Sequence, residues 1–191
     1  MKTHILTPQN FQTSQWSGGT TTQLYISPEG ATLANRDFKL RISIAKVETS
    51  ESSFTSLPGV NRKLMILEGE ITITHEGHYS KHLKPFDVDT FKGDWKTNSK
   101  GTCTDFNVMT TGEQQNEMYY LAMGAAMNYK LKPKSTCKDL FIYATSGNCT
   151  LRMLGENHFF HKGDLMVIED FTIPSISISS PKAFGIVVLE V

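Results

Sequence analysis

The sequence predicts an all-β protein, and two observations lead to this prediction. Apolar and polar residues alternate with a period of two along many short runs, which is typical of strands whose two faces differ. Glycine, proline, asparagine and serine interrupt these runs at short intervals, as they do in β-sandwiches and barrels. Strong helical periodicity is missing, and only residues 119–128 fit either a strand or a short helix.

The clearest alternation lies in two runs of the first half. In residues 38–45, Arg41 and Ser43 alternate with apolar neighbours, and in residues 103–109 the polar members are Asp105 and Asn107. Glu76-Gly77 is expected to form a hairpin turn. Other expected strands cover residues 64–67, 71–76, 140–143, 149–153, 165–168, 173–178 and 184–191.

A faint internal repeat predicts two similar halves. A glycine, an alternating strand and a Gly-Asp turn follow one another as Gly69 and Gly93-Asp94, and again as Gly147 and Gly163-Asp164. The order is typical of a cupin barrel, so the sequence predicts a bicupin, with two small jelly-roll β-barrels packed together. The polar run 110–117 divides the chain into residues 1–112 and 113–191, and strands exchanged between the halves are allowed by the pattern.

Composition and charge exclude several classes of partner. Nineteen Lys and Arg balance nineteen Asp and Glu, and no basic tract stands out, so no nucleic-acid partner is expected. The apolar runs are too short to span a bilayer and the N-terminus lacks a signal-peptide pattern, so no membrane partner is expected. Three cysteines far apart, without a CxxC pair, predict reduced thiols and, by elimination, a cytoplasmic location.

Five motifs in order give the chain a resemblance to a known family, the HutD/Ves proteins. The motifs are Trp16-Ser17-Gly18-Gly19-Thr20-Thr21-Thr22, Arg41-Ile42-Ser43-Ile44-Ala45, Leu57-Pro58-Gly59-Val60-Asn61-Arg62 with the preceding Ser53-Phe54-Thr55, Phe91-Lys92-Gly93-Asp94 and Asp105-Phe106-Asn107-Val108-Met109. The resemblance implies a bicupin associated with histidine utilisation, which senses or buffers a pathway intermediate and catalyses no step.

The polar residues of these motifs form the candidate ligand site. Arg41 and Arg62 carry planar guanidinium groups suited to bidentate binding of a carboxylate. Asp105 would orient one of them or accept an N–H from the ligand, whereas Ser43 and Asn107 would supply neutral hydrogen bonds. The remaining member, Trp16, would form an apolar wall. We expect a small acidic metabolite, for example an acylated amino acid.

Each of these assignments has a structural alternative. The polar strand faces would have the same pattern if they faced water. Arg41 and Asp105 would also suit a structural ion pair between strands. Trp16 would equally serve as a core anchor beside glycine turns, and Pro58-Gly59 is expected to form a type II turn before Arg62.

Catalytic and metal chemistry find little support in the sequence. The chain lacks a His-x-His pair and a Gly-x-Ser-x-Gly motif, so we expect no catalytic residue, no metal and no cofactor, and surface positions for the histidines. The alternative function is a cupin-type isomerase, lyase or oxygenase whose metal is bound by His75, His78, His158 or His161. A third alternative is a structural module that forms a homodimer through exposed strand edges.

Overall fold

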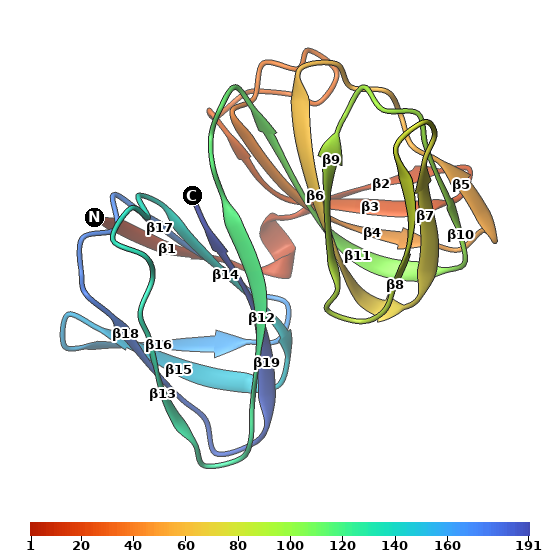
Figure 1. The fold of residues 1–191 in the computed structure, drawn as a ribbon. Helices are drawn as coiled ribbons and strands as arrows, with labels where there is room; N and C mark the ends of the chain where they lie inside the picture. Colours follow the sequence, from red (N-terminus) through yellow and green to blue (C-terminus); the bar gives the residue numbers. More distant parts are fainter. The chain divides into compact units, whose positions relative to one another are not determined.

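The computed structural model describes residues 1–191 as strands joined by turns, with one short 3-10 turn, η1 (Pro8–Asn10) (Figure 1). Every strand pairing is antiparallel, so the all-β prediction is confirmed. The chain contains no helix with the length and hydropathy needed to cross a bilayer. It divides into two compact units, one of residues 11–114 and one formed by residues 1–10 together with residues 115–191.

The unit of residues 11–114 consists of two sheets. The six-stranded sheet has the order β2-β3-β4-β11-β6-β9, and the four-stranded sheet has the order β5-β10-β7-β8. Their bounds are β2 (Gln12–Trp16), β3 (Gly19–Ser27), β4 (Leu40–Val47), β5 (Glu51–Ser53), β6 (Val60–Gly69), β7 (Ile71–His75), β8 (Tyr79–Leu83), β9 (Val88–Lys92), β10 (Thr97–Lys100) and β11 (Cys103–Thr111).

The other unit has the same two-sheet construction. A five-stranded sheet has the order β1-β17-β14-β19-β12, and a four-stranded sheet has the order β13-β18-β15-β16. Their bounds are β1 (Lys2–Leu6), β12 (Glu117–Met123), β13 (Asn128–Leu131), β14 (Leu140–Ser146), β15 (Asn148–Met153), β16 (Glu156–His161), β17 (Leu165–Glu169), β18 (Ile176–Ser179) and β19 (Phe184–Glu190). The ambiguous segment 119–128 is therefore mostly strand β12, followed by a turn.

The internal repeat is present as a repeat of topology. The sheets β4-β11-β6-β9 and β5-β10-β7-β8 correspond strand by strand to β12-β19-β14-β17 and β13-β18-β15-β16. Gly69 and Gly147 lie at the same corner of the two units, where the chain leaves one sheet for the other. Both have positive φ, of 76° and 68°. A Cβ would lie 2.4 Å from the Thr102 carbonyl oxygen at Gly69, and 2.5 Å from that of Ala183 at Gly147.

The Gly-Asp part of the expected repeat is wrong. Gly163-Asp164 lies between β16 and β17, whereas Gly93-Asp94 follows β9, which is the counterpart of β17. The true equivalent of Asp164 is Asp87: each carboxylate accepts a backbone N–H three residues earlier, at 2.8 Å from His161 and 2.9 Å from Lys84. Gly-Asp suits many kinds of turn, so the sequence match selected the wrong one.

The first ten residues lie in the unit of residues 115–191, whereas the expected division was 1–112 and 113–191 with strands free to be exchanged between the halves. Strand β1 pairs with β17 along its whole length, from Lys2 opposite Glu169 to Leu6 opposite Leu165. Ile5 also packs against the apolar core of that unit. The boundary after residue 114 lies within the polar run 110–117.

The two units differ in how their interiors are filled. In the unit of residues 115–191, apolar side chains from both sheets form one core, among them Ile142, Phe160, Met166, Ile178 and Ile186. In the unit of residues 11–114, a smaller apolar cluster is built around side chains of β6, β7, β8 and β9. The concave side of β4 and β11 instead carries the polar residues that line a cavity.

Candidate functional site

A cavity of about 600 Å³ lies in the unit of residues 11–114. Its walls come from β2, β3, β4, β5, β6 and β11 and from the segments 33–36 and 54–57. The size is within the range of small-molecule sites in proteins. All six residues that the sequence singled out line this one cavity: Trp16, Arg41, Ser43, Arg62, Asp105 and Asn107.

Strand register explains why the two arginines meet. Arg41 on β4 and Arg62 on β6 are both paired with Met109 on the central strand β11. Side chains two residues apart on a strand face the same side, so Asn107 and Asp105 follow Met109 along the same face. The alternation could not distinguish a cavity from a solvent face, and the structure places these polar side chains in the cavity, where they are buried.

Arg41 is held by neutral hydrogen bonds. Its Nε donates to Gln23 Oε1 at 2.9 Å, and its Nη1 donates to Ser43 Oγ at 3.1 Å. Burial lowers the pKa of this guanidinium. Asp105 is paired with Ala45, four residues along β4 from Arg41, and the two side chains form no ion pair. The structural ion pair considered for them is therefore not formed.

Arg62 is buried without a hydrogen-bonding partner at Nε. Its side chain is 9% exposed, and the Nε atom has no acceptor within bonding distance. The guanidinium carbon lies 4.9 Å from the centroid of the Phe54 ring and 5.2 Å from that of Phe91. Burial lowers the pKa of Arg62 to about 10, with the nearby charge of Asp105 opposing this shift and that of Arg41 adding to it.

Asp105 is the one carboxylate in the cavity wall. It is 2% exposed, and burial raises its pKa to about 7. Four neighbours lower the pKa instead: the Cys103 thiol, which donates to Oδ2 at 3.6 Å, the charge of Arg62, the Asn107 amide, which donates to Oδ1, and the backbone of Ala45. Asp105 can therefore exchange a proton near neutral pH.

Trp16 forms part of the cavity wall and is no core anchor, because 39% of it is exposed. Its indole covers Gly18, where a Cβ would lie 2.1 Å from a Trp16 ring carbon. The Pro58-Gly59 turn has the expected form. Val60 N–H donates to the Leu57 carbonyl at 3.1 Å, and Gly59 has a φ of 80°.

Sequence reasoning missed several residues of this site. Arg36 also lines the cavity, from the segment between β3 and β4, and no periodicity or motif marks it. Phe54 lay within a quoted motif but was given no role, and Gln23 and Phe91 were likewise unassigned. An isolated arginine on a loop carries no sequence signal for its direction.

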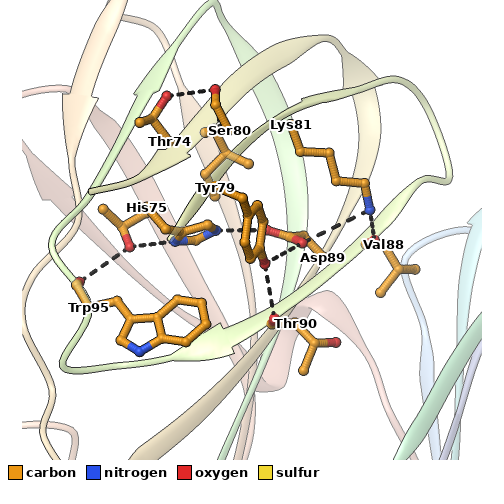
Figure 2. A network of polar contacts seen from close by, with 11 residues as sticks. Thr74, His75, Tyr79, Ser80, Lys81, Val88, Asp89, Thr90 and Trp95 are labelled. Atoms are coloured by element: carbon orange, nitrogen blue, oxygen red, sulfur yellow. Dashed lines mark hydrogen bonds and ion pairs between the residues drawn. The ribbon is translucent and has the colours of Figure 1, made fainter. Parts of the chain in front are cut away.

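The expectation of surface positions for the histidines is wrong for His75. This side chain is only 1% exposed and lies in a buried polar network (Figure 2). Period-two alternation placed His75 on the same side as Ile71 and Ile73, which was a signal for burial. His78, His82 and His161 are exposed. No group of three or more His, Cys, Asp or Glu side chains is arranged to hold a metal ion.

The family model named HutD matches residues 8–183 of this chain. The chain belongs to the HutD family. A curated relative from Pseudomonas putida, an uncharacterized 21.2 kDa protein in the hutC 3′ region, is 26% identical over 156 residues, which cover 79% of this chain and 78% of that protein.

Solved structures share the fold. The crystal structure of PA5104 from Pseudomonas aeruginosa PAO1, a conserved protein of unknown function, has a TM-score of 0.85 at 18% identity and covers 100% of this chain and 98% of that chain. HutD from Pseudomonas fluorescens SBW25 has a TM-score of 0.71 at 19% identity, over 99% of this chain and 98% of that chain. YhhW from Escherichia coli has a TM-score of 0.75 at 10% identity, over 100% of this chain and 97% of that chain. Such neighbours establish a cupin-type fold.

Proposed function

We propose that this HutD-family chain is a non-catalytic binding protein that takes up a small acidic metabolite in the cavity of residues 11–114. In this proposal each unit is a small jelly-roll barrel of the cupin type, and the protein senses or buffers an intermediate of histidine catabolism in the cytoplasm. An acylated amino acid is our example of the ligand class.

The observation that carries the proposal is the buried guanidinium of Arg62, whose Nε has no hydrogen-bond acceptor. A buried charge is costly unless it is paired and hydrogen-bonded. Arg62 lies against two aromatic rings, its Nε has no acceptor, and Asp105, whose charge is nearby, forms no hydrogen bond or ion pair with it. Arg41, paired with the same residue of β11, adds a second positive charge. An anion between the two guanidinium groups would supply the missing partner.

The rest of the cavity suits a ligand with more than one polar group. Guanidinium groups bind carboxylates in a bidentate manner, with short charge-assisted hydrogen bonds. Asp105 and Asn107 can bond to an amide or another polar group of the ligand. Arg36 offers a further positive charge for a second acidic group. The wall formed by Trp16 and Phe54 would contact the apolar part.

A second hollow, of about 490 Å³, supports the choice of site by contrast. It lies in the other unit, around Asn148, Phe159 and Lys182. The charged residue of its wall, Lys182, is exposed, as is the aromatic Phe159. This hollow has no buried charge that lacks a partner.

The family relationship gives the proposal its metabolic setting. The Pseudomonas putida relative is described by its place in the hutC 3′ region, and HutD of Pseudomonas fluorescens SBW25 was determined in a formate condition.

Thermal unfolding in the presence of small carboxylates tests the proposal. Acetate, succinate, N-acetylglycine and intermediates of histidine breakdown would each be added to the purified protein. A ligand present at about one hundred times its dissociation constant should stabilise the folded state by about 2.7 kcal/mol. Arg62→Met should abolish the shift. It should also cost the ligand-free protein little or no stability, because the cost of burying the guanidinium offsets its contacts with the two rings and the attraction of Asp105.

Arg152→Gln is the matched control. Arg152 is an exposed arginine on β15, so its loss changes the net charge equally and leaves the cavity intact. The control should keep the full ligand-induced shift. The absence of a shift with every carboxylate, or a full shift in Arg62→Met, would contradict the proposal. Stoichiometric metal in the purified protein, measured by elemental analysis, would instead favour the metal-dependent cupin enzyme.

A further inference from the structure

A buried polar network crosses between the two sheets of the unit of residues 11–114. His75 is the last residue of β7 in the four-stranded sheet, and Asp89 is on β9 in the six-stranded sheet. His75 Nε2 and Asp89 Oδ2 lie 2.9 Å apart, and both side chains are almost completely buried. Figure 2 shows the imidazole of His75 and the phenol of Tyr79 both directed at the Asp89 carboxylate.

Both ends of the His75 ring are fixed. Nδ1 lies 2.8 Å from Thr97 Oγ1, and that hydroxyl also donates to the Trp95 carbonyl at 3.2 Å. On the other side, Tyr79 donates to Asp89 Oδ1 at 3.0 Å. Burial, and then the hydrogen bond to Asp89, raise the pKa of Tyr79 to about 12, so the phenol remains a donor at neutral pH. The ring therefore has a single orientation set by bonds at both nitrogens.

The network contacts the proposed anion site through one aromatic ring. The centroids of the His75 and Phe91 rings lie 4.5 Å apart, and the Arg62 guanidinium carbon lies 5.2 Å from the same Phe91 ring. Strand pairing explains why these residues are neighbours. Asp89 and Phe91 face the same side of β9, and Phe91 is the direct cross-strand partner of Arg62.

We propose that His75 is a positioning residue for the anion site, acting with Asp89 to hold Phe91 in the place that orients the Arg62 guanidinium. The predicted effect on binding rests on the proposed function, whereas the predicted effect on the orientation of Arg62 needs no ligand. Arg62 has no hydrogen bond at Nε to fix its direction, so the rings of Phe91 and Phe54 are its main lateral support. A shift of Phe91 would thus move the charge that the ligand contacts.

The test compares three variants with the wild-type protein. His75→Phe keeps a planar ring of similar size against Phe91 and removes both hydrogen bonds. Asp89→Asn keeps an acceptor for His75 Nε2 and should preserve the arrangement. His78→Phe is the matched control, because His78 stacks on the Trp95 ring at 3.8 Å from the exposed side and its side chain has no hydrogen bond in the buried network.

Two readouts distinguish positioning from general support of the fold. The first is the NMR signal of the Arg62 Nε–H group, which needs no ligand. The second is the dissociation constant of N-acetylglycine at neutral pH. His75→Phe should move the Arg62 signal and weaken N-acetylglycine about tenfold, which corresponds to about 1.4 kcal/mol. Asp89→Asn and His78→Phe should change the dissociation constant less than about twofold, or about 0.4 kcal/mol.

The outcomes separate this inference from the proposed function. An unmoved Arg62 signal in His75→Phe, with a lowered melting temperature only, would overturn the positioning role and assign His75 to fold stability. A moved Arg62 signal supports the positioning role even if the wild-type protein binds no carboxylate. That lack of binding would contradict the proposed function only. If His75→Phe does not fold, Asp89→Leu removes the same bond from the other side and is read in the same way.

Discussion

At the residue scale, two buried groups in one cavity respond to burial in opposite ways. Burial disfavours the charged form of both, so the pKa of Arg62 falls and that of Asp105 rises. Arg62 stays charged at neutral pH because its pKa of about 10 is still well above 7. Asp105, with a pKa of about 7, is only partly ionised there. The cavity therefore keeps a net positive charge at neutral pH.

Replacing Asp105 by Asn should change how stability depends on pH. In the unfolded chain this carboxyl ionises near pH 3.9, and in the folded protein only at about 7. The raised pKa means that its contribution to folding is fully present below pH 4, is lost as the pH rises to 7, and is constant above. The loss amounts to about 4 kcal/mol at most. In urea unfolding at pH 4.5, 6 and 8, the unfolding free energy of Asp105→Asn relative to wild type should increase as the pH rises.

The exposed Asp94→Asn variant, which changes the net charge equally and leaves the cavity intact, is the control for this measurement. The affinity of the wild-type protein for an anion should also fall as the pH rises through 7, because the ionised form of Asp105 repels an anion bound near it. A difference between Asp105→Asn and wild type that does not grow between pH 4.5 and 8 would contradict the raised pKa.

At the element scale, the corners between sheets depend on glycine for two separate reasons. Gly69 and Gly147 have positive φ, and at both a Cβ would collide with a backbone carbonyl of the neighbouring strand connection. Gly77, in the β7–β8 hairpin, has a φ of 78° but open space around the position of a Cβ. Comparing the positions separates backbone strain from steric collision.

Alanine at Gly77 should therefore cost about 1 kcal/mol of unfolding free energy, from the left-handed backbone alone. Alanine at Gly69 should cost roughly 3 kcal/mol or more, since the Thr102 carbonyl must also move. Gly147→Ala should resemble Gly69→Ala because the two corners are topologically equivalent. Equilibrium urea unfolding measures all three, and equal costs at Gly69 and Gly77 would contradict this account.

Period-two alternation predicted nine of the nineteen strands, among them β4 and β11, whereas it could not predict which strands pair. The run 38–45 and the run 103–109 were expected as strands, but nothing in either indicates that both flank the same cavity. Turn residues were a weaker guide. Gly163-Asp164 matched Gly93-Asp94 in sequence, although Asp87 is its structural counterpart. Turn chemistry is determined locally, so similar dipeptides recur at unrelated turns.

At the scale of the whole molecule, the N-terminus belongs with the C-terminal part of the chain. β1 extends the five-stranded sheet by pairing with β17, and Ile5 packs against the core of that unit. The remaining eight strands of the unit, β12 to β19, repeat the order of β4 to β11. A repeat detected in sequence could not reveal this pairing, because β1 lies outside the repeated strands.

Removal of residues 1–6 should destabilise the unit of residues 115–191 selectively. β17 would become an edge strand, and its backbone groups opposite β1 would lose their partners. Hydrogen exchange should become faster in β17 and β14 while β4 and β11 remain protected, and carboxylate binding should persist. A Lys2→Ala variant keeps the pairing and serves as the control. Uniform loss of protection in both units would argue against the observed division of the chain.

The sequence by itself determined the all-β class, the family and most of the polar residues that lie together, since alternation and motif order are local properties of the chain. Only the tertiary structure decided three matters: that Arg41 and Arg62 lie on either side of Met109, that Arg62 has no hydrogen-bonding partner at Nε, and that His75 is buried against Asp89. The physical reason is that pairing between distant strands sets which side chains meet. Burial then sets the free energy of each charge.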